Sequence, residues 1–432
     1  MAKTKPPTLD ISPPLLNSAN PWATNLDDLR ALYLRESTGA VTTRTSMLGG
    51  FGHDENKHQY VFFNGSNHDN VTPISSLSGP VPQNASLNSL GYSPLRLAEY
   101  LDMIRTIARE AGAQARRKWF IISVTGTPEE VAVSYTNILA AQRSLPLSSF
   151  PLAMEINLSC PNIPGKPPPA YSGPALAQYL TAVFNAIKRG DSAYGLRIAV
   201  GLKTPPYTHN GQYQMLTDEL LILAASNGGV CPVSFLTATN TLGSCLVLEP
   251  HDDDEGGFEL ALPEPGIGGL AGAPLHPLAL GNVTMLGRML DDHRAELGHM
   301  QIIGVGGVSD AAGYRRMMAV GAAAVGVGTA LGLKGFAVFD EIYGEIAGKG
   351  DEDGGAKLQR GMASLDLAGE ADEVLCGKTY NTRDSPVVTH PSTGLAVTGL
   401  SVGERTGSRV VQYLWSYMEE VPEGVGSHRD AL

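Results

Sequence analysis

The sequence is poor in cysteine and in positive charge, and both shortages exclude classes of protein. Four cysteines are spread over 432 residues without a Cys-x-x-Cys pair. We therefore expect neither a disulfide scaffold nor a zinc site of the usual spacing, and no bound metal. A formal net charge of −12 argues against nucleic acid as a partner, because that affinity depends mostly on Lys and Arg contacts. An anionic ligand must be held by a local group of donors.

Long apolar segments are also missing. The chain begins MAKTKPPTLDISPP, which has no apolar core, so no secretory signal is expected. The uncharged run 317–333 is rich in glycine and alanine and slightly shorter than a membrane span. We interpret it as a helix end followed by a buried strand. These features predict a soluble, cytoplasmic protein in a reducing compartment, without a membrane partner.

What the chain does contain is an alternation of short apolar runs and helical patterns. The runs lack strict polar alternation, which is typical of parallel strands buried on both faces. Seven are predicted strands: 40–45, 119–125, 153–158, 196–203, 233–240, 301–305 and 323–327. A weaker run at 15–18 would complete an α/β fold, the (β/α)8 TIM barrel. An open doubly wound sheet is the alternative, but no Gly-x-Gly-x-x-Gly motif follows an early strand.

Helical spacing of apolar residues, or helix-start signals, predict four helices between these strands, at 95–113, 128–142, 174–187 and 309–320. Two stretches do not fit the alternation. Residues 49–83 are polar and predict a loop or a β-excursion inserted after the second strand. We expect residues 348–432 to be a C-terminal extension with one of three roles: packing on the barrel, forming a small subdomain or mediating association. The predicted domains are therefore 1–347, with its insertion, and 348–432.

Cys160 follows the predicted strand 153–158, at the end where barrel enzymes place catalysis. It lies in Asn-Leu-Ser-Cys-Pro-Asn-Ile-Pro-Gly-Lys, residues 157–166, whose prolines indicate a stiff loop. A thiol at a pocket mouth can serve as a general base or a nucleophile. The alternative is an inert buried cysteine.

Asparagines and one lysine lie at neighbouring strand ends. Asn157 and Asn162 bracket the cysteine, Asn240 closes another strand, and Asn88 precedes a glycine turn. Each amide offers donors and an acceptor, which suits a planar heterocycle with N–H and C=O groups, although asparagine is also common in turns. Lys203 could stabilise negative charge developing on a cofactor; otherwise it is a surface lysine.

Glycine-rich segments close the last two predicted strands. Gly-Val-Gly-Gly-Val-Ser at 304–309 and Gly-Val-Gly-Thr at 326–329 are similar to the barrel phosphate site, where backbone N–H groups meet an anion. Residues 266–272 form another glycine-rich loop, which either lets the backbone approach a ligand or is a flexible turn.

Together these segments resemble the soluble, class 1 dihydroorotate dehydrogenases, which use cysteine as their base. The cysteine followed by Pro-Gly-Lys is similar to the fumarate-linked subclass. Further matching segments occur in family order between residues 10 and 346, at 88–91, 201–206, 239–243, 268–272, 302–308 and 326–331. The resemblance implies oxidation of (S)-dihydroorotate to orotate in pyrimidine (UMP) biosynthesis, with FMN as the hydride acceptor, fumarate as the second acceptor, and a homodimer.

The resemblance also implies residue roles. Cys160 would remove the C5 proton of dihydroorotate. FMN would be held by Ala19, Arg44, Asn157, Lys203, Gly269, Gly306, Gly307, Gly328 and Thr329. The pyrimidine would be held by Asn88, Leu90, Gly91, Asn157, Asn162, Asn240 and Thr241.

The chain departs from the family pattern near the expected flavin. Asn20 replaces a glycine, and Arg44 replaces a lysine, which keeps the charge in a different geometry. The family's Gly-Asn-Pro-x-Pro-Arg loop is absent from 49–60, and Tyr92-Ser93 replaces Leu-Pro. Three alternatives therefore stay open: an FMN-binding barrel for another cyclic substrate, a catalytically inactive paralogue whose extension contacts a partner, or a flavin-free barrel using Cys160 as a covalent nucleophile.

Overall fold

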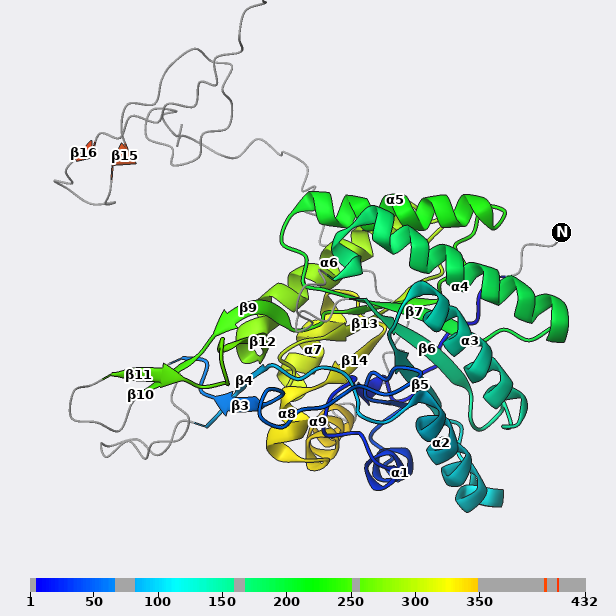
Figure 1. Cartoon of the computed structure of the whole chain (residues 1–432), viewed down its shortest axis with the longest axis horizontal. Helices are drawn as coiled ribbons and strands as arrows, with labels where there is room; N and C mark the ends of the chain where they lie inside the picture. Colours follow the sequence, from blue (N-terminus) through cyan, green and yellow to red (C-terminus); the bar gives the residue numbers. More distant parts are fainter. Residues whose placement is uncertain are drawn as a thin grey trace, which may run out of the picture. The chain divides into compact units, whose positions relative to one another are not determined.

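The computed structural model describes residues 5–66, 82–158, 168–250 and 257–348, and two strands near the C-terminus. Eight parallel strands close into a barrel in the order β1-β14-β13-β8-β7-β6-β5-β2 (Figure 1). They are β1 (Leu15–Asn17), β2 (Ala40–Thr42), β5 (Trp119–Val124), β6 (Leu152–Asn157), β7 (Ala199–Thr204), β8 (Phe235–Ala238), β13 (Gln301–Val305) and β14 (Ala324–Val327). The predicted (β/α)8 barrel is confirmed, including its weak first strand.

Helices follow the strands and surround the barrel. They are α1 (Leu26–Leu34), α2 (Leu97–Ala111), α3 (Pro128–Arg143), α4 (Gly173–Tyr194), α5 (Asn210–Ser226), α6 (His276–Asp292), α7 (Ala311–Ala319), α8 (Thr329–Lys334) and α9 (Ala337–Gly348), with short 3-10 turns η1 (Gly112–Gln114), η2 (Pro169–Tyr171) and η3 (Ala273–Leu275). The helix-start signal at the beginning of α3 is a capping box: Thr127 Oγ1 accepts from Glu130 N at 3.2 Å, and Glu130 Oε2 accepts from Thr127 N at 2.7 Å.

The barrel strands bury different residues on their two faces. Along β6, Leu152, Met154 and Ile156 pack against the helices, whereas Ala153 joins an apolar cluster inside the barrel. Phe235 fills that interior beside Gly201, where an added Cβ would lie 2.2 Å from the Phe235 ring. Toward the carboxyl ends of the strands the inward positions become polar, so the cavity opens above a dry core.

A second, antiparallel sheet lies to one side of the barrel (Figure 1). Its order is β3 (Tyr60–Phe63), β4 (Ala85–Asn88), β12 (Ile267–Gly272) and β9 (Leu242–Leu246), and the hairpin β10 (Leu248–Pro250) and β11 (Phe258–Leu260) extends from it. The predicted β-excursion at 49–83 thus contributes β3, while residues 67–81 lie outside the described part. The prediction of a loop at 266–272 is wrong, because β12 pairs with both β4 and β9.

The chain divides into two compact units, Met1–Arg360 and Gly361–Leu432. In the second, the structure describes only the antiparallel pair β15 (Leu400–Ser401) and β16 (Val410–Val411), so the domain boundary and the role predicted for 348–432 stay predictions. The run 317–333 contains the end of α7, then β14 and most of α8. Within the described ranges, no helix is long and apolar enough to cross a membrane.

Candidate functional site

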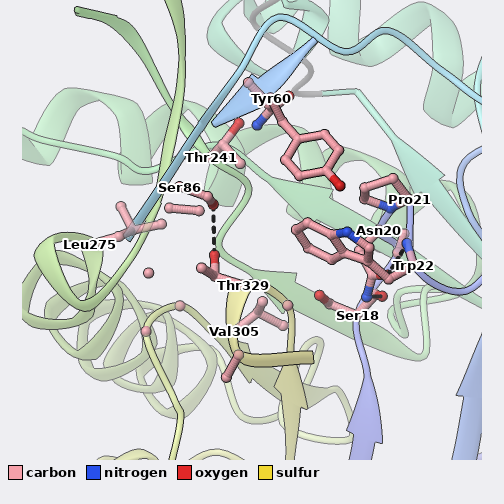
Figure 2. A pocket seen from close by; sticks show the side chains of 18 of the residues that line it. Ser18, Asn20, Pro21, Trp22, Tyr60, Ser86, Thr241, Leu275, Val305 and Thr329 are labelled. Carbon is pink, nitrogen blue, oxygen red and sulfur yellow. Dashed lines mark hydrogen bonds between the residues drawn. The ribbon is translucent and has the colours of Figure 1, made fainter. Parts of the chain in front are cut away.

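A cavity of about 550 Å³ opens at the carboxyl ends of the barrel strands. Residues at or just after the ends of β1, β2, β6, β7, β8, β13 and β14 line it, together with residues of β4 and β12. Its volume is in the range of small-molecule sites. Figure 2 shows Ser86 of β4 beside Thr329 of α8, with their hydroxyl oxygens 2.9 Å apart. This bond joins the second sheet to the barrel at the cavity wall.

The structure brings most of the predicted site residues together around this cavity. The lining residues among them are Ala19, Arg44, Asn88, Leu90, Gly91, Asn157, Lys203, Asn240, Thr241, Gly306, Gly307, Gly328 and Thr329. Gly269 lies outside the lining and supports it instead, because its carbonyl accepts from Asn88 Nδ2 at 3.0 Å.

Cys160 and Asn162 lie outside the described residues. The two ends of their loop are nevertheless joined, since Ala170 N donates to Leu158 O at 3.2 Å. Tyr207 Oη donates to Ala170 O at 3.0 Å and anchors the same point. The described residues on the two sides of this segment are therefore adjacent, and Leu158 directly follows Asn157, a cavity residue.

The glycine loop after β13 packs closely against its neighbours and presents its backbone to the cavity. Gly306 has φ +139° and Gly307 has φ +68°, conformations that favour glycine. A Cβ on Gly307 would lie 2.6 Å from His276 Cβ and 2.7 Å from Gly272 O. The backbone of this loop can therefore approach a ligand as only glycine allows.

His276 and Arg316 hold this loop from behind, and sequence analysis missed both, because no local pattern connects them to it. Arg316 Nε donates to His276 Nε2 at 3.0 Å. Since a guanidinium has only donors, Nε2 carries no proton, and the proton is on Nδ1. His276 Nδ1 thus donates to Gly306 O at 2.7 Å, and the Gly306 peptide is fixed in one orientation.

Arg44 supplies the clearest sign of a missing anionic or carbonyl acceptor. It lines the cavity, and its Nη2 is buried without a hydrogen-bond partner among the described residues. Burial lowers the pKa of the Arg44 guanidinium. A buried donor without an acceptor is costly, so a ligand that brings an acceptor here would bind favourably. Thr239 also lines the cavity, and its Oγ1 is likewise buried without a hydrogen-bond partner among the described residues.

Asn157 and Asn240 lie side by side on the wall. Asn240 Nδ2 donates to Asn157 Oδ1 at 3.1 Å, and Asn157 Nδ2 donates to Thr45 Oγ1 at 3.0 Å. Such a pair offers the mixed donors and acceptors expected for a heterocycle.

Asn20, which departs from the family pattern, bonds within its own turn: Asn20 Nδ2 donates to Ser18 O at 2.6 Å, and Trp22 N donates to Asn20 Oδ1 at 2.9 Å. Trp22 and Tyr60 also line the cavity, edge to face with ring centroids 5.5 Å apart. Figure 2 shows them on one side, opposite Ser86 and Leu275. Sequence analysis missed this aromatic wall, since its residues come from two distant segments.

Known proteins provide an independent comparison. The family model described as dihydroorotate dehydrogenase matches residues 80–349. Dihydroorotate dehydrogenase A (fumarate) of Lactococcus lactis subsp. cremoris is 29% identical over 261 residues, covering 60% of this chain and 72% of that protein. The enzyme of the same name from Lactococcus lactis subsp. lactis is 28% identical over the same shares.

A solved ligand-free DHODH from Eimeria tenella is similar in fold, with a TM-score of 0.56 and 17% identity over 82% of this chain and 90% of that one. The family model matches more than half of the present chain. The chain belongs to the dihydroorotate dehydrogenase family.

Proposed function

We propose that the protein oxidises (S)-dihydroorotate to orotate, with FMN as its flavin cofactor. The observation that carries the proposal is one continuous cavity that joins a glycine cradle to a pair of asparagines and a lysine. Gly306, Gly307, Gly328 and Thr329 would hold a phosphate, as strand ends do in other barrels. FMN, when bound, supplies a hydride acceptor.

The residues present fit this cofactor. Arg44 carries a buried donor that lacks an acceptor among the described residues, and the ring carbonyls of a flavin would supply one. A side chain at Gly307 would collide with His276 and Gly272 O behind the loop, so only glycine keeps this backbone in place beside the cavity. Ala19, Asn157 and Lys203 line the same cavity and would surround the ring system, with Gly269 acting through Asn88.

The substrate would lie against the asparagines. Asn88, Asn157, Asn162, Asn240 and Thr241 would hold the pyrimidine and its carboxylate, together with the backbone at Leu90 and Gly91. Cys160 would take the C5 proton while the hydride leaves C6. The two cysteines in the described part of the chain are poorer candidates for the base, since neither lines the cavity and burial raises the pKa of the Cys231 thiol to about 12 and also raises that of Cys245.

Fumarate is the proposed second acceptor, because relatives carry it in their names. The setting would be cytoplasmic pyrimidine biosynthesis by a homodimer, with the FMN-binding barrel in residues 1–347 and an extension in 348–432. A second candidate is an FMN-binding barrel for another cyclic substrate. Two features favour this candidate over a site that is identical to the family's dihydroorotate site. They are the aromatic wall of Trp22 and Tyr60, and Arg44 in place of a lysine.

Anaerobic absorption spectra test the proposal. The purified protein should be yellow, and dihydroorotate should bleach its flavin band. Cys160→Ala should retain FMN and be reduced far more slowly, whereas Cys245→Ala serves as the matched control and should be reduced normally. A protein that stays colourless with added FMN would rule out both candidates, and a yellow protein that dihydroorotate does not bleach would favour the second.

A further inference from the structure

A series of buried hydroxyl groups connects a carboxylate inside the barrel with the amides of the cavity. Glu155 on β6 is 2% exposed. Ser123 Oγ donates to Glu155 Oε1 at 2.9 Å, and Thr237 Oγ1 donates to Oε2 at 2.7 Å. Ser123 Oγ lies 2.9 Å from Thr45 Oγ1, which accepts from Asn157 Nδ2 at 3.0 Å. Glu155 lies outside the cavity lining, whereas Asn157 is part of it.

The carboxylate sets the direction of each bond in this series. A hydroxyl group has one proton to donate. Ser123 gives its proton to Glu155, so it must accept from Thr45. Thr45 has then used its own proton and can only accept from the amide nitrogen of Asn157. If the Asn157 amide were flipped, its oxygen would face the Thr45 hydroxyl. That hydroxyl has already given its proton to Ser123, so no hydrogen bond could form.

The same order extends to the second asparagine. With Nδ2 of Asn157 directed at Thr45, its Oδ1 accepts from Asn240 Nδ2 at 3.1 Å. Asn240 Oδ1 then accepts from Thr241 N at 2.9 Å. The two ends of an amide have nearly the same shape, so packing cannot distinguish them, and hydrogen bonds decide their orientation.

We propose that Glu155 is a positioning residue that determines which amide atoms of Asn157 and Asn240 face the ligand. The inference rests on the proposed function for the identity of that ligand, FMN and a pyrimidine. A ring with N–H and C=O groups in fixed places can hydrogen-bond to one orientation of an amide. The flipped amide would face donor with donor and acceptor with acceptor. Glu155 thus acts on recognition without touching the ligand.

Two matched substitutions test the inference. Ser123→Ala and Thr237→Val each remove one hydroxyl donor to Glu155, and both sites lie outside the cavity lining. Only Ser123 is part of the series that leads to Asn157. Ser123→Ala should weaken orotate binding to the FMN-loaded protein about tenfold, as expected for one misdirected hydrogen bond.

Thr237→Val should leave orotate binding within about twofold of the parent protein, while both variants lower the unfolding temperature. Titration of the flavin spectrum with orotate gives the affinities. Equal weakening by the two variants would mean that the hydroxyls merely satisfy a buried carboxylate, and unchanged binding by Ser123→Ala would also overturn the inference.

A second measurement needs no ligand. Asn157→Asp places a carboxylate oxygen next to the Thr45 hydroxyl, whose proton is donated to Ser123. Ser123→Ala removes that acceptor, so Thr45 can donate its proton to the new carboxylate. Ser123→Ala should therefore lower the unfolding temperature of the ligand-free protein less when Asn157→Asp is also present. Additive losses would contradict the inference. A protein that shows this coupling but binds no FMN would retain the positioning role and reject the proposed function.

Discussion

At the scale of single residues, Arg44 lines the cavity with a buried guanidinium nitrogen that has no acceptor among the described residues. Arg44→Met should weaken FMN binding by about ten- to a hundredfold, because a hydrogen bond to a charged group contributes about 1.5–3 kcal/mol. The FMN affinity of Arg44→Lys should lie between those of the parent protein and Arg44→Met, since lysine keeps the charge and loses the planar guanidinium. Fluorescence titration of stripped protein with FMN measures the loss.

Arg105 on α2 provides the control, because it is half-exposed, lies outside the cavity lining, and bonds only to Asp102 of its own helix among the described contacts. Arg105→Met should bind FMN as the parent protein does. If Arg44→Met bound FMN equally well, the buried guanidinium would have no part in holding the cofactor.

His276 is a second residue with a defined effect. His276→Phe keeps an aromatic ring behind Gly307 but removes both the donor to Gly306 O and the acceptor for Arg316. We expect FMN affinity to fall about tenfold, because the glycine loop is no longer held in one orientation. Riboflavin, which has no phosphate, serves as the control ligand. A similar loss of affinity for riboflavin would show that His276 does not act through the phosphate loop.

At the scale of elements, β12 positions Asn88 through close backbone contact. A Cβ on Gly268 would lie 2.6 Å from Asn88 O, whereas a Cβ on Gly281 of α6 has no neighbour within 4 Å. Gly268→Ala should destabilise the protein by about 1–3 kcal/mol and weaken orotate binding, because β4 must shift. Gly281→Ala, the matched control, should stabilise its helix by roughly 0.5–1 kcal/mol. Chemical denaturation and orotate titration separate the two effects.

Seven barrel strands and four helices were predictable because they have strong local signals, whereas β1 gave only a weak one. Buried parallel strands are continuous apolar runs, and α3 carries a capping box at Thr127 and Glu130. The second sheet was not predictable in this way. Residues 266–272 contain four glycines, and their strand conformation depends on β4 and β9, which are distant in the sequence.

The same division applies to the site. Lys203, Asn240 and the glycine loops end barrel strands, so their meeting follows from the fold. Trp22 reaches the cavity, and His276 reaches the glycine loop behind it, through tertiary packing that no spacing in the sequence encodes. Glu155 was read as part of a buried strand, and its hydroxyl partners come from β5 and β8.

At the scale of the whole molecule, Lys118 connects stability with pH. It is buried at the start of β5 and donates to Leu32 O at 3.2 Å and to Thr38 Oγ1 at 3.0 Å. Burial lowers its pKa from 10.5 to about 7, aided by the charges of Arg116 and Arg35. Between these values the unfolded chain binds a proton that the folded chain does not, so stability should rise with pH from about 7 to 10.5.

Denaturation of the full chain at several pH values measures this slope. One group contributes up to about 1.4 kcal/mol per pH unit. Lys118→Met should remove that contribution and flatten the curve, whatever its effect on stability at neutral pH. Parallel curves for the two proteins would show that Lys118 keeps its proton in the fold.

The cavity is built from two parts of the chain, the barrel and the antiparallel sheet beside it. Its glycine cradle belongs to the barrel strands, whereas Asn88, Leu90 and Gly91 lie in or beside β4, in the sheet that covers one side. Substitutions in β3, β4 and β9 that keep the Ser86–Thr329 hydrogen bond can therefore change the shape of the cavity while its glycine cradle stays the same. A relative with a different ligand can arise by changes in this sheet without new barrel strands.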